Sequence, residues 1–360
     1  MAIPHSPSRR QWLLATVASV GVLRNVHSEA AKEDAGLLET ASPASSASSY
    51  ANSLDERLEN LRQTASQLSR LRALVVMYKG DTVLAETFSG PPVDVSVNVK
   101  SVSKSLVAAL VGCAIERNVI PDVSLTLGDT IPDLLPKKAD PRVASLSIEH
   151  LLTMQAGLER TSGRNYGPWV SSDDWVDYVL SRPFVAEPGG RMLYSTGDWH
   201  VLGALLSRLT DASLLDLSRE WLGKPLDIEF PPWTRDPQGR YMGGNEMSLS
   251  PVDMARFGEL YRQKGRWQNE RVFSQQWAKD SFIPRTRSPY SGDEYGYGWF
   301  IRNVESSGFV YARGYGGQFI HVLPQEGIVV AMTSDWTRSA RGGDYTEQLH
   351  DLVISNLLNV

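Results

Sequence analysis

The sequence of 360 residues contains little cysteine, little histidine and no excess of basic charge. Its single cysteine, Cys113, excludes an internal disulfide and a cysteine-rich zinc site. The 36 basic and 41 acidic residues give a net charge of −5, which argues against a nucleic-acid partner because such a partner requires a basic surface. With 42% hydrophobic and 21% charged residues, the composition is that of an ordinary globular protein.

Several signatures of known chemistry are also absent. No serine lies in a Gly-x-Ser-x-Gly motif, which excludes the nucleophile elbow of α/β-hydrolases. The sequence has no phosphate-binding Gly-x-x-x-x-Gly-Lys, no Gly-x-Gly-x-x-Gly and no His-Glu-x-x-His. The histidines beyond the N-terminus lack the spacing of metal ligands and are interpreted as structural or surface residues: His150, His200, His321 and His350.

The N-terminus carries an export pattern. Arg9 and Arg10 precede an apolar run over 12–23, which is too short to span a bilayer. The pattern predicts that residues 1–30 are a twin-arginine-type signal peptide, so that the mature protein is periplasmic and keeps no stable membrane anchor. The alternative is a cytoplasmic N-terminus in which the two arginines occur by chance.

Beyond the signal, residues 31–53 are rich in Ala and Ser and predict a linker. Ser53 and Glu56 form a capping-box pair that predicts a helix from there. Strand patterns lie near both ends of the remaining chain and helical patterns lie in the middle. The predicted strands are 73–78, 83–88, 309–313, 318–323 and 328–333, and the main predicted helices are 101–117, 148–155, 173–180, 198–209, 251–264 and 345–358.

This order of elements predicts the fold class. Strands at both ends with helices between them favour an α/β (α+β) fold, in which one antiparallel sheet carries an inserted, mostly helical lobe. N- and C-terminal helices flank the sheet. We assign 54–100 plus 245–360 to the sheet lobe and 101–244 to the helical lobe, so that 54–360 forms one catalytic domain.

One motif suggests chemistry. Ser101 and Lys104 are spaced i, i+3 at the start of an apolar helical stretch, where the Cβ atoms of two such residues lie about 5–6 Å apart. A lysine amine can activate a serine only if its pKa falls from about 10.4 toward about 7–8, and burial in the apolar stretch favours such a shift. The alternative is a helix-capping serine beside a surface lysine.

Two later segments support the first interpretation. Residues 188–198 place Tyr194 directly before a helix, and residues 314–320 open a strand with three glycines that allow backbone to approach a ligand closely. Together the three motifs resemble the serine β-lactamase and penicillin-binding superfamily, in its class C β-lactamase-like carboxylesterase and amidase branch, which includes 6-aminohexanoate-dimer hydrolases. The resemblance covers about 71–336 and includes the stretches 147–158 and 295–299.

The resemblance implies a role for each matching residue. Ser101 is the expected acylated nucleophile, Lys104 its base and Tyr194 a proton relay. The backbone N–H groups of Ser101 and Gln318 are expected to form the oxyanion hole. Neither a metal nor an organic cofactor is required. The expected substrate-binding residues are Thr196, Tyr315, Gly316, Gly317, Tyr166 and Trp169.

Two departures from the family pattern bear on the substrate. Thr196 stands where β-lactamases usually have an asparagine, and Tyr315 stands where many relatives have a lysine. Loss of that cation removes a charge-assisted bond of about 1.5–3 kcal/mol to a substrate carboxylate, although Arg313 could replace it in part. We therefore expect a serine hydrolase acting on small esters or linear amides. The alternatives are a β-lactamase or D-amino-acid peptidase, and a non-catalytic sensor.

Other residues near these motifs are open to two interpretations. Tyr166 and Trp169 lie in a loop that could cover an apolar acyl group, but core packing is the ordinary role of a tryptophan. Asp198 and His200 either tune the site or serve as a helix cap and a surface residue. Cys113 is interpreted as a small core residue.

Overall fold

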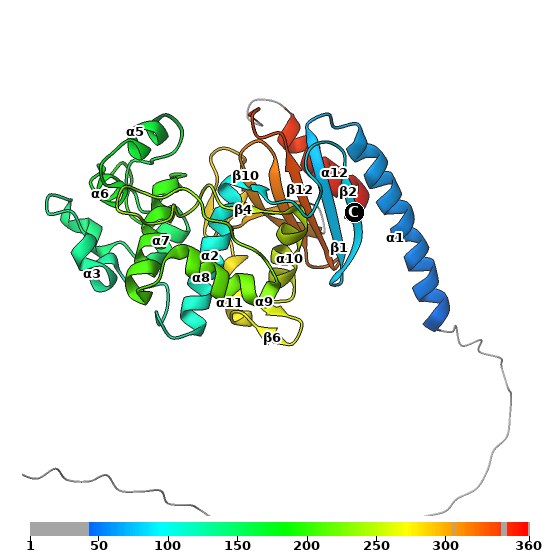
Figure 1. The fold of residues 1–360 in the computed structure, drawn as a ribbon, viewed down its shortest axis with the longest axis horizontal. Coiled ribbons are helices and arrows are strands. Elements are labelled where there is room, and N and C mark those ends of the chain that lie inside the picture. Colours follow the sequence, from blue (N-terminus) through cyan, green and yellow to red (C-terminus); the bar gives the residue numbers. More distant parts are fainter. Residues whose placement is uncertain (1–42, 305–306, 340–343, 359–360) are drawn as a thin grey trace, which may run out of the picture. The chain divides into compact units, whose positions relative to one another are not determined.

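An eight-stranded antiparallel sheet, built from both ends of the chain, dominates one side of the structure (Figure 1). The computed structural model describes residues 43–304, 307–339 and 344–358, with side chains from residue 54 onward, and 49–360 form one compact unit. The strands of the sheet are β1 (Leu71–Tyr78), β2 (Asp81–Thr87), β7 (Thr286–Arg287), β8 (Glu294–Tyr295), β9 (Phe300–Val304), β10 (Ser307–Gly314), β11 (Gln318–Leu323) and β12 (Ile328–Ser334).

The strand order is β2-β1-β12-β11-β10-β9-β8-β7, and all neighbouring strands pair antiparallel. The N-terminal hairpin β1–β2 therefore joins the C-terminal strands through β12, which confirms the predicted fold class. The sequence patterns missed the short strands β7 and β8 and the strand β9. Two small ribbons complete the strands: β3 (Val97–Asn98) with β4 (Ser248–Leu249), and β5 (Arg266–Trp267) with β6 (Glu270–Arg271).

Helices cover both faces of the sheet. α10 (Pro251–Arg262) packs on β1, β11 and β12, so closely that a Cβ on Gly258 would lie 2.7 Å from Ile320. α12 (Tyr345–Leu357) lies on the opposite face, because His321, which points away from its neighbour Ile320, contacts His350 there. α1 (Pro43–Ser66) lies beside the end of α12, where the Arg57 guanidinium donates to the Asn356 carbonyl at 2.9 Å.

α1 begins at Pro43, within residues 31–53 that were expected to form a linker. Proline suits the first helical turn, and alanine has the highest helix propensity, so an Ala- and Ser-rich stretch is compatible with a helix. Residues 1–30, including the expected signal peptide, lie outside the described residues. None of the helices in the described part of the chain is long and apolar enough to cross a membrane.

The middle of the chain is helical, and Figure 1 shows α3, α5, α6 and α7 grouped away from the sheet. Caps explain several helix boundaries: Ser250 accepts the Asp253 N–H ahead of α10, and Ser147 forms a capping box with His150. The remaining helices are η1 (Lys100–Val102), α2 (Ser103–Glu116), α3 (Leu127–Thr130), η2 (Pro132–Leu134), η3 (Pro141–Ser145), α4 (Ile148–Leu152), η4 (Gly163–Asn165), α5 (Tyr166–Val170), α6 (Trp175–Leu180), α7 (Thr196–Thr210), α8 (Leu214–Leu217), η5 (Ser218–Gly223), α9 (Lys224–Leu226) and α11 (Gln275–Ser281).

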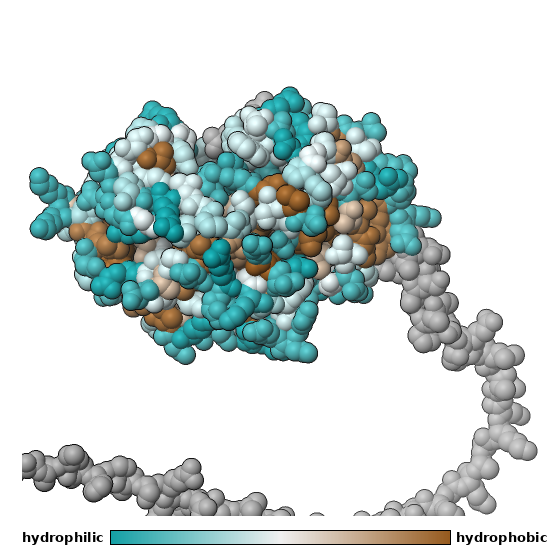
Figure 2. All heavy atoms as spheres, in the orientation of Figure 1, coloured by the Kyte–Doolittle hydropathy of each residue, from teal (hydrophilic) through white to brown (hydrophobic). Residues whose placement is uncertain are grey.

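The core runs without a break from the sheet into the helical region. α2, whose residues 103–114 are all buried, passes through it and contacts α7. Cys113 is buried on α2, and burial raises the pKa of its thiol to about 12, as expected for a core residue. On the face shown in Figure 2, hydrophobic residues form several separate patches within a largely hydrophilic surface.

Candidate active site

Ser101 lies in the 3-10 turn η1, one turn ahead of α2 rather than within it. The chain enters this turn through Lys100, whose backbone is left-handed with φ of 52°. Such a conformation costs a residue other than glycine about 1–3 kcal/mol, which the surrounding contacts must offset. The Lys100 N–H donates to Asn98 Oδ1 at 2.9 Å, which holds the strained turn from the side of β3.

The Lys100 side chain holds the same turn from the opposite side. Its ammonium lies 3.3 Å from Glu246 Oε1 and 4.4 Å from the ring centroid of Trp336. Glu246 also accepts from the Asn98 amide at 2.6 Å, and its own backbone is left-handed with φ of 69°. Two strained residues, Lys100 and Glu246, therefore fix each other next to Ser101.

Lys104 is buried, with only 2% of its surface exposed, and its amine contacts three oxygen atoms. Nζ lies 3.0 Å from Ser101 Oγ, 3.3 Å from Thr196 Oγ1 and 2.8 Å from the carbonyl oxygen of Gly244. Burial lowers the pKa of Lys104, while Tyr194 and Asp198 oppose that shift. The direction is the one that a lysine base requires.

The three contacts orient the amine. A neutral amine has two N–H donors and one lone pair, whereas a peptide carbonyl can only accept a hydrogen bond. The Gly244 carbonyl must therefore receive an N–H from Lys104, and Thr196 Oγ1 can accept the second. In this arrangement the lone pair faces Ser101 Oγ, where it can take the hydroxyl proton.

Tyr194 and Asp198 are the titratable side chains that influence Lys104. The ring centroid of the half-buried Tyr194 lies 5.0 Å from Nζ. Asp198, in the first turn of α7, is 3% exposed, and burial raises its pKa to about 7 against the opposing effects of Ser195 and Lys104. Asp198 and His200 are both buried, so the interpretation of His200 as a surface residue is wrong.

The glycine-rich third motif forms the turn between β10 and β11. Both strands contact η1, which brings Gln318, at the start of β11, to the turn that holds Ser101. The Gln318 side-chain amide donates to the Ser334 carbonyl at 2.9 Å, so it is engaged within the sheet. Tyr315 is 47% exposed at the tip of the turn and is free to contact a ligand.

Gly316 and Gly317 are required by the turn itself. Their φ values are 83° and 100°, in the left-handed region that favours glycine. A Cβ on Gly316 would lie 2.4 Å from Trp336 Cα, and one on Gly317 would lie 2.8 Å from the Tyr345 ring. Packing against their own chain explains both glycines without a ligand.

The expected substrate-binding residues of the helical region have different surroundings in the structure. Thr196 Oγ1 contacts the Lys104 amine and lies 2.9 Å from Ser162 Oγ, so it belongs to the surroundings of the base. The half-buried Tyr166 hydroxyl accepts from Asn245 at 3.0 Å. Trp169 is completely buried and donates to the Trp175 carbonyl at 3.1 Å. Trp169 therefore packs in the core, the alternative given for it above, and its expected contact with substrate stays a prediction.

Sequence reasoning missed the segment 236–246, which supplies the Gly244 carbonyl. The Gly243-Gly244 pair was its available signal, because paired glycines often mark a close approach of backbone. A Cβ on Gly244, whose φ is 79°, would lie 2.5 Å from Trp199 Cβ and 3.3 Å from Lys104 Cγ. Among the described residues, no group of three or more His, Cys, Asp or Glu side chains could hold a metal ion.

Comparison with known proteins identifies a family to which the sequence is similar. A family model described as Beta-lactamase matches residues 61–353. Among solved structures, the hydrolase EstCE1, described as having promiscuous acyltransferase activity, is 19% identical with a TM-score of 0.68, covering 84% of this chain and 98% of its own. A family VIII carboxylesterase is 14% identical with a TM-score of 0.66, covering 85% and 98%.

A provisionally named 6-aminohexanoate-dimer hydrolase from Bacillus anthracis is 18% identical with a TM-score of 0.66, covering 80% of this chain and 78% of its own. At these identities the structures share the fold.

Proposed function

The chain belongs to the beta-lactamase family, and on that premise we propose that it is a serine hydrolase acting on small esters or linear amides through an acyl-enzyme. The single observation that supports this most strongly is the buried Lys104 amine, 3.0 Å from Ser101 Oγ. A buried amine whose pKa is lowered, with its lone pair facing a serine, is suited to general-base activation of that serine.

The proposed reaction has two stages. Ser101 Oγ attacks the substrate carbonyl carbon while its proton passes to Lys104 Nζ. The carbonyl oxygen becomes an oxyanion held by the backbone N–H groups of Ser101 and Gln318. Collapse of this intermediate expels the alcohol or amine, which takes the proton through Tyr194. Water then cleaves the acyl-enzyme, and the same groups return the proton to Ser101.

The surroundings of the third motif favour a neutral substrate. Tyr315 places an exposed phenol where many relatives have a cation. The Lys100 ammonium is paired with Glu246, and the Arg313 guanidinium donates to Thr346 at 3.2 Å. Lys100 is thus neutralised by Glu246, and Arg313, although it keeps its charge, has one N–H directed to Thr346, so the site lacks the dedicated third-motif cation and esters and uncharged amides fit better.

The test is a panel of p-nitrophenyl esters, anilides and nitrocefin on wild type, Ser101→Ala and Ser105→Ala, with a phosphonate adduct detected by intact mass. Ser105, a buried serine that donates to the Gly298 carbonyl at 2.6 Å, is the matched control. We expect ester turnover and a Ser101 adduct in wild type and in Ser105→Ala, and neither in Ser101→Ala. Undiminished turnover by Ser101→Ala would exclude this nucleophile, and rapid nitrocefin turnover would favour a β-lactamase.

Export through the twin-arginine route to the periplasm is part of the proposal. It rests on Arg9, Arg10 and the apolar run after them. Replacing both arginines by lysine is expected to retain the protein in the cytoplasmic fraction, while wild type reaches the periplasmic fraction. Equal distribution of the two proteins would contradict the predicted signal.

A further inference from the structure

The carbonyl that contacts Lys104 belongs to a segment pressed against α7. A Cβ on Gly243 would lie 2.1 Å from the Trp199 carbonyl oxygen and 2.9 Å from His200 Cα. Only glycine fits at such distances, so the backbone of 243–244 is wedged between α7 and Lys104. The position of the Gly244 carbonyl therefore depends on what holds Gly243 against α7.

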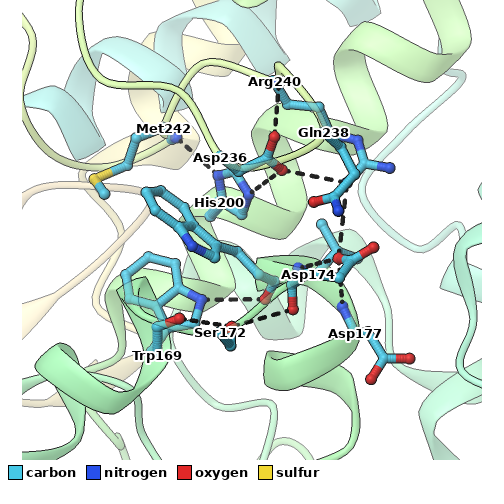
Figure 3. Close-up of polar contacts among 12 residues, drawn as sticks. Trp169, Ser172, Asp174, Asp177, His200, Asp236, Gln238, Arg240 and Met242 are labelled. Carbon is cyan, nitrogen blue, oxygen red and sulfur yellow. Dashed lines mark hydrogen bonds and ion pairs between the residues drawn. The ribbon is translucent and has the colours of Figure 1, made fainter.

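The His200 ring contacts two residues. One ring nitrogen bonds to Gly243, and the other lies next to Asp236. Nδ1 accepts the Gly243 N–H at 3.3 Å, and Nε2 lies 3.2 Å from Asp236 Oδ2 (Figure 3). Both side chains are completely buried. The His200 ring thus links Asp236, at the beginning of the segment 236–246, to Gly243, which precedes the glycine whose carbonyl contacts Lys104.

The contacts also define the state of the ring. Nδ1 accepts an N–H and so carries no proton, which places the proton of the neutral ring on Nε2, where it is donated to Asp236. The Nδ1 lone pair is engaged by the Gly243 N–H and is therefore not available to act as a base. Trp169 and Trp175 pack against the ring, with centroids 5.9 and 5.4 Å away, and close this pocket.

Asp236 is in turn fixed by its own segment and by α6. Its carboxylate accepts the Arg240 backbone N–H at 2.7 Å and lies 3.2 Å from the Arg240 guanidinium. Arg240 also lies 3.8 Å from Asp174, which caps α6. Asp236, with its partner Arg240, is the charged group that contacts His200, and Tyr194 and Asp198 are the titratable groups that influence Lys104.

We propose that His200 and Asp236 are positioning residues for Lys104. They fix Gly243 so that the Gly244 carbonyl takes one N–H of the amine and leaves its lone pair facing Ser101. The inference rests on the proposed function, because it assigns how the base of that reaction is oriented. It adds to the three motifs two buried residues that act on Lys104 through the backbone of residues 243–244.

Two variants separate the two contacts of His200. In His200→Asn the amide oxygen can occupy the place of Nδ1 and still accept the Gly243 N–H, whereas in His200→Gln the amide nitrogen can occupy the place of Nε2 and still donate to Asp236. His321→Asn is the control, because His321 is equally buried but lies in the sheet, away from the segment 236–246. The measurement is the pH dependence of kcat and KM for a p-nitrophenyl ester.

We expect His200→Gln to lower kcat about 10-fold or more with little change in KM, and His200→Asn to lower it less. The acidic limb of the profile is the loss of rate at low pH, where Lys104 becomes protonated. It should move to lower pH in His200→Gln, because loss of a carbonyl acceptor destabilises the ammonium form of Lys104. If the substitution instead loosened the packing around Lys104 in general, water would reach its amine, raise its pKa and move the acidic limb to higher pH. His321→Asn should change the thermal midpoint and leave the profile unchanged.

A limb that stays in place or rises in folded His200→Gln overturns the inference, as does an equal effect of His321→Asn. If His200→Gln does not fold, Asp236→Asn serves in its place, since it weakens the same anchor and should move the limb in the same direction. Phosphonate labelling of Ser101 in wild type is measured in parallel. Absence of that adduct contradicts the proposed function, whereas labelling with an unmoved limb contradicts only the positioning role.

Discussion

Lys104 and the His321–His350 pair are both buried bases, but their surroundings differ. Lys104 has three oxygen atoms around its amine, one of which belongs to the partly exposed Ser101. In the histidine pair, Nε2 of His321 lies 3.0 Å from Nδ1 of His350, and the outer nitrogen of each ring has no hydrogen-bond partner among the described residues. Phe309, Tyr311 and Phe319 enclose the pair.

The physical cause of the low basicity is the same in both places. Burial lowers the pKa of Lys104, lowers that of His321 to about 3 and lowers that of His350 well below its usual range. The consequence differs because only Lys104 faces a group that can give up a proton to it. Burial therefore lowers the basicity of the proposed base Lys104 and makes the histidine pair sensitive to acid.

The sharpest test of this contrast is Lys104→Met, which keeps the length of the side chain and removes the base. We expect kcat/KM for a p-nitrophenyl ester to fall about 10²–10⁴-fold, because general-base catalysis typically contributes that much. Thermal stability should be unchanged or higher, since a buried amine no longer has to be desolvated. An active Lys104→Met enzyme would mean that another group takes the Ser101 proton.

The second test concerns the histidine pair and uses stability at acid pH. Below about pH 6.5 the unfolded histidines bind protons, whereas folded His321 does not until about pH 3, and burial also holds the pKa of folded His350 well below its usual value. Stability conferred by these groups is therefore present above pH 6.5 and is lost as the pH falls through that window. Wild type should bind up to two more protons on unfolding at acid pH than the double variant His321→Phe/His350→Phe, which lacks both titrating rings.

Urea unfolding at pH 7 and pH 5 measures this difference. The double variant should lose less stability than wild type between the two pH values and should hydrolyse the ester normally at pH 7. An identical loss in both proteins would show that the pair is not the acid-sensitive element.

Much of this contrast follows from local sequence, and part of it does not. The i, i+3 spacing of Ser101 and Lys104 is a local relation, and the apolar residues after Lys104 correctly predicted that its amine is buried. The strand 318–323 was predicted with the bounds that β11 has, because its flanking glycine turn and its apolar run are both local signals.

The contacts that sequence reasoning missed join distant parts of the chain. His321 and His350 look unrelated in sequence, and they meet only because α12 folds back onto β11. The Gly244 carbonyl reaches Lys104 from 140 residues further along the chain, and a backbone carbonyl leaves no side-chain signal at all. Trp169 shows a different limit, since its sequence left a covering loop and core packing both open, and only the structure shows that the side chain is completely buried.

The smallest expected effect concerns Asp198, a buried carboxyl near the buried Lys104 amine. Burial raises the pKa of this carboxyl from 3.8 to about 7, so between these values the folded protein holds a proton that the unfolded chain has released. Stability from this group therefore falls as pH rises from about 4 to 7, and above pH 7 the buried charge carries its full cost. Asp198→Asn removes that titration.

We expect the stability advantage of Asp198→Asn over wild type to be smallest at pH 4 and to grow toward pH 8, as measured by urea unfolding at both pH values. Loss of the negative charge beside Lys104 should also move the acidic limb of kcat/KM a few tenths of a pH unit lower, because a carboxylate favours the ammonium form. The rate itself should change only a few-fold, since Asp198 touches neither Ser101 nor the substrate carbonyl in the proposed reaction. A large loss of activity with no shift of the limb would instead place Asp198 among the groups that transfer the proton, and the distinction between the base and its surroundings would have to be redrawn.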